Sequence, residues 1–255
     1  MADVRQATEA IWAATMRREY FPAAWKGRLT VDEGYGVQLG LLDRYTAGGE
    51  RHVGWKVGLT ARAIREQVGM FEPVLGFLLA SGHWATGREI PFDSLLAPSI
   101  ENELCLTVGR TLQGPGVTEA QARAALSAAA PAFEVVERRG DFVADLPLAL
   151  ADNCQQKGFV TGTAQLLAPG VRLAATTVEV RVNGAPVERA TGAEVMGDPA
   201  ASVAWLANKL AQFGRSLETG MLVMSGSFTR QVAPSRGDRI EARFSPFGTV
   251  AVHFT

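Results

Sequence analysis

Residues 99–108 read Ser-Ile-Glu-Asn-Glu-Leu-Cys-Leu-Thr-Val, and their side chains alternate between two kinds at a period of two. One parity is mainly apolar and comprises Ile100, Asn102, Leu104, Leu106 and Val108. The other parity carries two carboxylates, Glu101 and Glu103. A β-strand points successive side chains to opposite faces, so the pattern predicts a strand with both glutamates on one face. Their Cα atoms would lie roughly 7 Å apart, close enough for both carboxylates to reach one ion.

A third glutamate, Glu134, lies in the β-prone run Ala132-Phe-Glu-Val-Val136, where an unpaired charge would be costly to bury. Three carboxylates brought together repel one another, and a bound divalent cation relieves that repulsion. The pattern therefore favours an oxygen-ligated Mg²⁺ or Mn²⁺ on Glu101, Glu103 and Glu134, with positions left open for a substrate. Carboxylates on the solvated face of an ordinary strand are the alternative, and spacing alone leaves it open.

The composition is that of an ordinary globular protein. The 255 residues are 47% hydrophobic, and 25 basic against 26 acidic side chains give a formal charge of −1. This balance gives no sign of a nucleic-acid or membrane-surface partner. Cys105 and Cys154 fit neither a disulfide framework nor a zinc motif. Because the N-terminus has no apolar leader and no run reaches the ~20 apolar residues of a membrane span, we expect a cytoplasmic protein.

Helix signals dominate the first third of the chain. Asp3 and the capping box Thr30-Val-Asp-Glu33 each begin a helix. Two later helices are predicted, one from the capping box at Thr118 to about Ala129, and one after Asp198-Pro199.

Short β-prone runs bounded by glycine and proline fill most of the rest. The strand candidates are 55–59, 76–79, 99–108, 132–136, 158–161, 177–182, 221–224, 239–244 and 249–254. Asn183-Gly184 predicts a hairpin turn. Many strands with few helices between them argue against a doubly wound parallel sheet. We therefore predict an α+β fold, with a small, mainly helical N-terminal lobe over residues 1–75 and a predominantly β catalytic core over residues 76–255.

A series of short motifs also runs from about residue 50 to the C-terminus. They are Gly54-Trp-Lys-Val-Gly-Leu-Thr60, Glu72-Pro73, Gly76-Phe-Leu-Leu79, Ile100-Glu-Asn-Glu103, Pro131-Ala-Phe-Glu-Val-Val-Glu-Arg-Arg139, Ala151-Asp-Asn153 with Gly158, Gly197-Asp-Pro199, Ala204-Trp-Leu-Ala-Asn-Lys-Leu210 and Ser225-Gly-Ser-Phe-Thr229. In this order they resemble the 2-hydroxydienoate (2-keto-4-pentenoate) hydratases and the 2-oxo-3-hexenedioate (4-oxalocrotonate) decarboxylases of aromatic meta-cleavage. These enzymes belong to the fumarylacetoacetate-hydrolase-like superfamily.

The resemblance implies a mixed β-roll core, a homo-oligomer and a divalent ion on the three glutamates. Lys56 matches the family's active-site lysine, which can hold an enolate oxygen or relay a proton; a solvated lysine at a strand edge is the alternative. Leu79, Gly226 and Ser227 are expected at the substrate. Arg139 is expected to support a ligand carboxylate from outside the metal's own shell.

The implied activity is that of a metal-dependent lyase. Our leading prediction is hydration of a 2-hydroxy-2,4-dienoate, of the 2-hydroxypentadienoate or 2-oxohept-4-ene-1,7-dioate type, to a 4-hydroxy-2-oxo acid. Decarboxylation of 2-oxo-3-hexenedioate on the same site is the close alternative. A third possibility is an inactive subunit that partners a sister hydratase or decarboxylase.

Several positions depart from the hydratase pattern. Val74 stands where hydratases typically have an aspartate, and Ala80-Ser81 stands where many relatives have two aspartates. A pocket short of these acids is less suited to activating water, which favours the decarboxylase alternative. Lys157 replaces a small residue in a loop near the substrate, where it could pair with a distal carboxylate or point to solvent.

Overall fold

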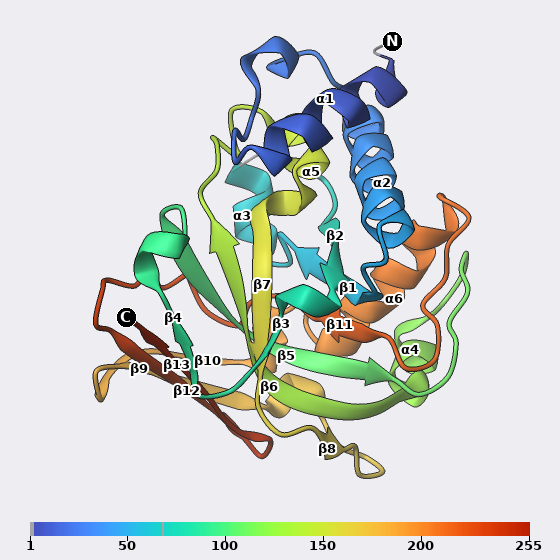
Figure 1. Cartoon of the computed structure of the whole chain (residues 1–255). Helices are drawn as coiled ribbons and strands as arrows, with labels where there is room; N and C mark the ends of the chain where they lie inside the picture. The colour runs from blue at the N-terminus through green and yellow to red at the C-terminus, as the bar shows by residue number, and fades with distance from the viewer. Residues whose placement is uncertain (1–2, 68) are drawn as a thin grey trace.

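The computed structural model describes residues 3–67 and 69–255, and within these ranges the strands form two sheets (Figure 1). The larger sheet has eight strands in the order β2-β1-β11-β5-β6-β7-β3, with β8 paired to β6. Its strands are β1 (His52–Gly58), β2 (Val74–Leu79), β3 (His83–Ala85), β5 (Pro98–Val108), β6 (Leu126–Glu137), β7 (Gln156–Thr161), β8 (Gln165–Leu166) and β11 (Leu222–Met224). This sheet is mixed, because β1 runs parallel to β11 while β5 and β6 are antiparallel.

The second sheet has five strands in the order β10-β9-β12-β13-β4. They are β4 (Arg88–Ile90), β9 (Thr177–Val182), β10 (Ala185–Thr191), β12 (Arg239–Ser245) and β13 (Gly248–Phe254). The predicted turn at Asn183-Gly184 joins β9 to β10, and the φ angles of 51° and 82° are those that a tight hairpin turn requires.

The described helices are α1 (Val4–Met16), α2 (Val31–Ala47), α3 (Arg62–Gln67), α4 (Glu119–Ala125), α5 (Leu146–Ala151) and α6 (Pro199–Ala211). In Figure 1, α1, α2 and α5 gather at one end of the molecule, and the five-stranded sheet with the C-terminus lies at the other. α2 packs on both α1 and α5, and α5 contacts β2. None of the helices in the described ranges is long and apolar enough to cross a bilayer. The α+β class is confirmed.

Local signals placed the first two helices correctly. The Asp3 carboxylate accepts hydrogen bonds from the backbone N–H groups of Arg5 and Gln6. Thr30 and Glu33 form the predicted capping box, in which each side chain accepts the other residue's backbone N–H.

The predicted alternation along β5 is confirmed, and both faces of the strand are covered. Ile100, Leu104 and Leu106 are fully buried in the main core. Cys105, on the opposite face, belongs to a second apolar cluster that also contains Leu78, Ala130, Ala132, Phe159 and Met224. A one-residue slip would turn Ile100, Leu104, Cys105 and Leu106 to the wrong face of β5, so packing on both sides fixes its register.

The predicted alanine-rich helix to Ala129 is wrong in its second half. α4 ends at Ala125, and β6 begins at Leu126. Alanine favours a helix on propensity, but Ala128 pairs with Thr107 of β5 on one side and with Leu166 of β8 on the other. These long-range backbone hydrogen bonds outweigh a weak local preference.

The division near residue 75 into a helical lobe and a β-rich core stays a prediction. β1, which precedes that boundary, pairs in parallel with β11 from the C-terminal quarter, through Trp55–Val223 and Lys56–Met224. This pairing brings Lys56 into the large sheet, next to the strands that carry the glutamates.

Candidate metal centre and its cavity

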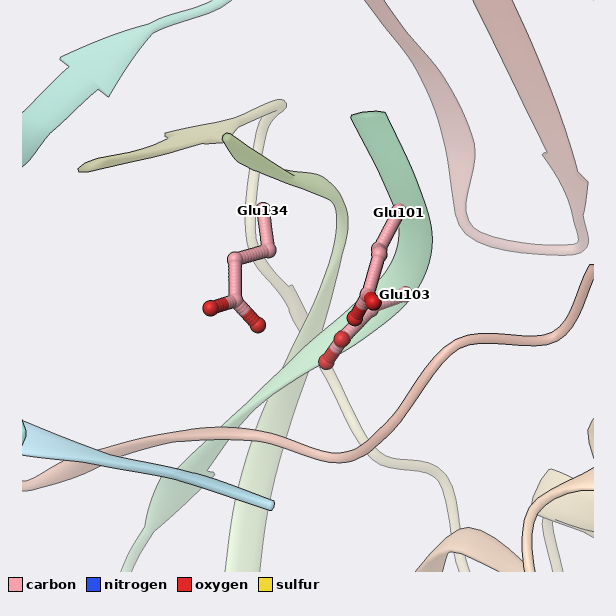
Figure 2. Close-up of side chains that lie close together, drawn as sticks. All are labelled: Glu101, Glu103 and Glu134. Carbon is pink, nitrogen blue, oxygen red and sulfur yellow. The ribbon is translucent and has the colours of Figure 1, made fainter. Parts of the chain in front are cut away.

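Strand pairing brings the three predicted glutamates together. Glu101 of β5 and Glu134 of β6 are direct cross-strand partners, and Glu103 lies two residues further along the same face of β5. One carboxylate oxygen from each lies within 4.8 Å of the others, and Figure 2 shows the three side chains pointing into one space. Residues 33 positions apart in the chain thus meet because β5 and β6 are antiparallel in this register.

The three carboxylates are largely buried, but not all of their oxygens accept a hydrogen bond. Glu103 and Glu134 are fully buried, and Glu101 is half-buried. The Gly226 N–H donates to Glu103 Oε2 at 2.8 Å, and Gln231 Nε2 donates to Glu101 Oε1 at 2.6 Å. Glu103 Oε1 and Glu134 Oε2 accept no hydrogen bond from any residue in the described ranges. Buried oxygens without a donor are costly, so these two atoms point to a missing positive partner.

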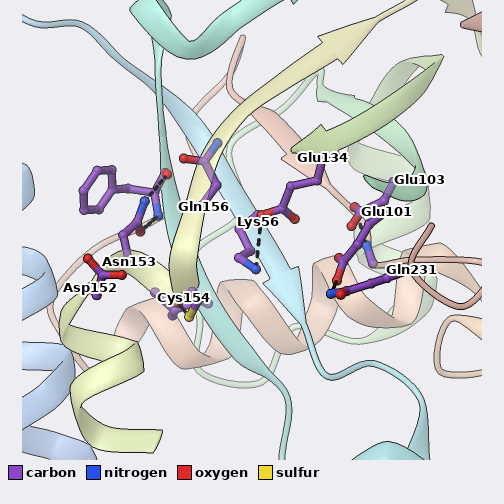
Figure 3. A network of polar contacts seen from close by, with 12 residues as sticks. Lys56, Glu101, Glu103, Glu134, Asp152, Asn153, Cys154, Gln156 and Gln231 are labelled. Atoms are coloured by element: carbon purple, nitrogen blue, oxygen red, sulfur yellow. Dashed lines mark hydrogen bonds and ion pairs between the residues drawn. The ribbon is translucent and has the colours of Figure 1, made fainter. Parts of the chain in front are cut away.

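Lys56 is the basic side chain that the fold places against this cluster. Its Nζ lies 3.2 Å from Glu134 Oε1, and its side chain is only 5% exposed (Figure 3). Burial by itself would lower the pKa of Lys56, but the Glu134 carboxylate, with Glu101 and Glu103 behind it, raises the pKa instead. Three carboxylates and one ammonium leave a formal charge of −2 in the site.

The acid pKa values show that this charge is not compensated. Burial, with repulsion from Glu134 and Glu101, raises the pKa of Glu103 well above its usual range. Burial raises the pKa of Glu134 to about 7 even though Lys56 opposes the shift. A dication would supply the missing charge.

The spacing of the oxygens also fits such an ion. Two oxygens on one ion can be separated by at most twice the metal–oxygen distance, which is about 4.2 Å for Mg²⁺ and about 5 Å for Ca²⁺. The observed limit of 4.8 Å lies between these values, so the oxygens are within the span of a Ca²⁺-sized ion and would have to move closer together to bind Mg²⁺.

Glycine makes room for the lysine. Gly76 is the cross-strand partner of Lys56, and a Cβ at Gly76 would lie 3.1 Å from Lys56 Cγ and 2.9 Å from Asn153 Oδ1. Asn153 in turn anchors β2, because its side chain accepts the Phe77 N–H and donates to the Phe77 carbonyl. The motif Gly76-Phe77 therefore serves to seat the Lys56 side chain.

A cavity of about 610 Å³ opens beside the cluster. It is lined by Lys56, Gly58, Leu59, Val74, Ser99, Glu101, Val136, Arg138, Arg139, Gly140, Asp141, Phe142, Val143, Cys154, Gln155 and Gln231. Lys56 and Glu101 stand at its metal end, while Val74, Val136 and Phe142 supply apolar wall. We call this space the glutamate cavity.

The residues expected at the substrate lie in different places. Gly226 has a φ of +110°, which favours glycine, and its N–H is the donor to Glu103. The Ser227 hydroxyl accepts the Asn102 N–H and donates to the Thr229 carbonyl, so it holds the loop against β5. Leu79 does not line the glutamate cavity; it lines a separate, smaller cavity of about 290 Å³.

Lys157 also lines that smaller cavity and not the glutamate cavity. Its side chain is half-buried, and Tyr20, Tyr45 and Trp84 are among its neighbours in the cavity wall. The structure therefore separates Lys157 from the glutamates.

In the described ranges Arg139 makes no hydrogen bond or ion pair with the three glutamates, and its expected support of a ligand carboxylate stays a prediction. Its Nε donates to Asp152 Oδ2 at 2.7 Å, and its Nη1 donates to Glu137 Oε2 at 3.2 Å. Arg139 shares its parity with Glu137 and not with Glu134, so the alternation of β6 does not direct it to the three glutamates. Its charge is used to compensate two other buried carboxylates.

Two contributors were not foreseen from the sequence. Gln231 reaches Glu101 because the loop after β11 pairs with β5 through Ile100 and Val232. Cys154 lines the cavity in a stretch where Asn153, Cys154 and Gln155 all have positive φ angles. No local sequence signal marks either feature, since both depend on long-range packing.

Comparison with known proteins agrees with this geometry. Residues 50–255 match the family model described as the C-terminal domain of fumarylacetoacetate hydrolase. The chain is 34% identical over 230 residues to a 2-hydroxyhexa-2,4-dienoate hydratase of Comamonas testosteroni, covering 89% of this chain and 87% of that protein. It is also 34% identical over 227 residues to a 4-oxalocrotonate decarboxylase of Pseudomonas sp. (strain CF600), covering 89% and 86%.

The decarboxylase activity also appears among the solved structures. A 4-oxalocrotonate decarboxylase from Pseudomonas putida G7, complexed with magnesium and adipate, superposes with a TM-score of 0.92 at 31% identity. The match covers 99% of this chain and 97% of that one. The shared fold therefore extends to the N-terminal helices, beyond the residues that the family model matches.

Proposed function

Because this chain belongs to the fumarylacetoacetate hydrolase family, we propose that it is a metal-dependent lyase acting on a 2-hydroxy-2,4-dienoate or its 2-oxo tautomer. The observation that carries this proposal is the cluster of Glu101, Glu103 and Glu134, whose oxygens lie within 4.8 Å of one another beside the buried Lys56. A purely structural cluster would satisfy its own charges, whereas this one retains a formal charge of −2.

A hard dication is the group that the donor set suits. All three protein ligands are carboxylate oxygens, and such sites select Mg²⁺, Mn²⁺ or Ca²⁺ over softer metals. A solved decarboxylase relative is complexed with magnesium in one structure and with calcium in another, which supports a divalent ion of this class here. We place Mg²⁺ first and Mn²⁺ second.

Held by the three carboxylates, such an ion would supply a Lewis acid that polarises a 2-oxo acid chelated through its carboxylate and C2 oxygen. The protein's own groups do the rest. Lys56 is protonated and buried, so its ammonium is placed to donate a hydrogen bond or a proton to an enolate oxygen. Val74 and Val136 shield the carbon chain from water along the cavity wall.

Hydration of the dienoate is our first candidate reaction. The 2-hydroxy-2,4-dienoate takes up a proton at C5 as it ketonises, and water adds at C4 to give a 4-hydroxy-2-oxo acid. Hydratases of three such dienoic acids are among the relatives at 30–34% identity, which supports this order of preference.

Decarboxylation is the second candidate, and Val74 is the observation that favours it. In this reaction the bond to the leaving carboxylate breaks, its electron pair enters the dienolate, and a proton replaces carbon dioxide. Because this reaction does not require an activated water molecule, it does not need an acidic residue at position 74. Val74 lines the cavity as the cross-strand partner of Gly58, two residues from Lys56.

One assay separates these candidates. Purified protein with Mg²⁺ is supplied with 2-hydroxypentadienoate and, separately, with 2-oxo-3-hexenedioate. Loss of dienol absorbance without carbon dioxide supports hydration, and release of carbon dioxide supports decarboxylation. Failure to turn over either substrate at any concentration of Mg²⁺ or Mn²⁺ would refute the lyase proposal and would favour a non-catalytic subunit. We also propose, from family membership, that the active form is a homo-oligomer, which light scattering would test.

A further inference from the structure

The paired strands β5 and β6 form the floor of the glutamate cavity, and residues from Glu134 onward along β6 lead away from the three glutamates. Successive cross-strand pairs are Glu101 with Glu134, and Ser99 with Val136. The Arg138 N–H then donates to the Ala97 carbonyl at 3.3 Å, so the pairing continues one step past the end of β6.

Alternation places Arg138 on the cavity side. Glu134, Val136 and Arg138 share one parity, and β6 pairs with β5 without a register shift over this stretch. Val136 and Arg138 both line the cavity, in agreement with the shared parity, and Arg139 reaches its wall as well. Along β6 the floor therefore presents a carboxylate, an apolar side chain and a guanidinium in turn.

The length of this row suits a short diacid. Glu134 and Arg138 are four residues apart, or about 13 Å along a strand. A six- or seven-carbon chain spans roughly 6–8 Å between its carboxyl carbons, from bond lengths of about 1.5 Å. The remaining distance of about 5 Å is within the reach of an extended arginine side chain.

Arg138 also has its charge available. Its guanidinium makes no hydrogen bond or ion pair with any side chain in the described ranges. The neighbouring Arg139 is committed to Asp152 and Glu137. Asp141, the nearby acid in the cavity wall, accepts the backbone N–H groups of Val143 and Ala144, so it is held in a loop cap of its own.

From this row we propose that the site selects a dicarboxylate, whose distal carboxylate is bound by Arg138. The proposal rests on the proposed function, since it assumes that the 2-oxo acid end binds at the three glutamates. A monocarboxylate such as 2-hydroxypentadienoate would leave the Arg138 end of the row empty. Lys157, the other cation considered for this role, lines the smaller cavity and does not line the glutamate cavity.

The test uses two unreactive 2-oxo acids of equal length that differ only at the far end, 2-oxoadipate and 2-oxohexanoate. Calorimetry in the presence of Mg²⁺ measures the Kd of each for wild type, Arg138→Gln, Arg138→Lys and Lys157→Gln. We expect wild type to bind 2-oxoadipate about tenfold more tightly than 2-oxohexanoate, the size of one charge-assisted hydrogen bond. Arg138→Gln should abolish that preference, and Arg138→Lys should retain part of it.

Lys157→Gln is the matched control, because it removes a cation that does not line the glutamate cavity. It should keep the full preference for 2-oxoadipate. Equal binding of the two acids by wild type, or loss of the preference in Lys157→Gln but not in Arg138→Gln, would overturn the assignment of Arg138. If neither acid binds, the proposed function fails with it, and that outcome is distinct from equal binding of both.

Discussion

Replacing Glu103 with glutamine separates the metal site from the stability of the fold. The change removes one negative charge, and the amide retains an oxygen that can accept the Gly226 N–H now bonded at 2.8 Å. Glu103 is fully buried, and its burial beside two other carboxylates raises its pKa well above the usual range. The variant should therefore fold, and without metal it should be at least as stable as wild type.

The size of the effect follows from linkage. At a Mg²⁺ concentration one hundred times its Kd, wild type gains about 2.7 kcal/mol of stability. An unfolding entropy near 2.1 cal/mol/K per residue gives about 0.5 kcal/mol/K for this chain, so Tm should rise by about 5 °C. In Glu103→Gln the charge of the site falls from −2 to −1. A hundredfold loss of affinity would leave about 0.4 kcal/mol, or less than about 1 °C.

The assay is thermal unfolding in excess EDTA and over a series of Mg²⁺ and Mn²⁺ concentrations. Glu137→Gln is the matched control, because Glu137 is an equally buried glutamate that pairs with Arg139 and accepts the Leu96 N–H outside the cluster. It should keep the full shift of several degrees. The reasoning is refuted if Glu103→Gln gains as much stability from the ions as wild type, or if wild type gains none.

Three further outcomes are expected. Lys56→Met should lower kcat by about a hundredfold or more while it keeps the metal-dependent rise in Tm, and parallel turnover and melting experiments would show whether the two effects separate. Gly76→Ala should cost about 1–3 kcal/mol in urea denaturation, because its Cβ would lie 2.9 Å from Asn153 Oδ1; an unchanged midpoint would contradict the close packing. Burial raises the pKa of Asp152 to about 6 from an ordinary 3.8, despite Arg139, so the folded state binds more protons between these values. Wild-type stability should then lose about 3 kcal/mol from this group as pH rises from about 4 to 6, and Asp152→Asn should flatten that part of the profile; parallel profiles of the two proteins would argue against the shift.

Features that depend on neighbouring residues were predictable from the sequence. The period of two along residues 99–108 placed Glu101 and Glu103 on one face of a strand, and the structure has them there. The capping box of Thr30 and Glu33 placed the start of α2, because its hydrogen bonds close within four residues.

Features that depend on strand pairing were not predictable in the same way. Glu134 becomes the partner of Glu101 only in the register that β5 and β6 adopt; the residue pattern suggested its role, and the family resemblance strengthened that assignment. Arg139 binds Asp152, which is 13 residues away, and no local pattern marks that partner. Leu79 and Lys157 fell in a second cavity because cavity walls are assembled from several elements whose packing no local pattern encodes.

The register of β5 and β6 links the stability of the fold to the proposed chemistry. Ile100 and Leu104 anchor one face of β5 in the main core, and this fixes which side chains turn to the other face. That face then carries the carboxylates at one point of the ladder and Arg138 about 13 Å along it. A slip of β5 by one residue would turn Glu101 and Glu103 away from Glu134 and would place the apolar side chains of β5 on the wrong face. Core packing therefore fixes the distance between the three glutamates and Arg138, the two ends of the proposed substrate site. Substitutions in the loops of the cavity wall can change the chemistry of the site without changing that distance.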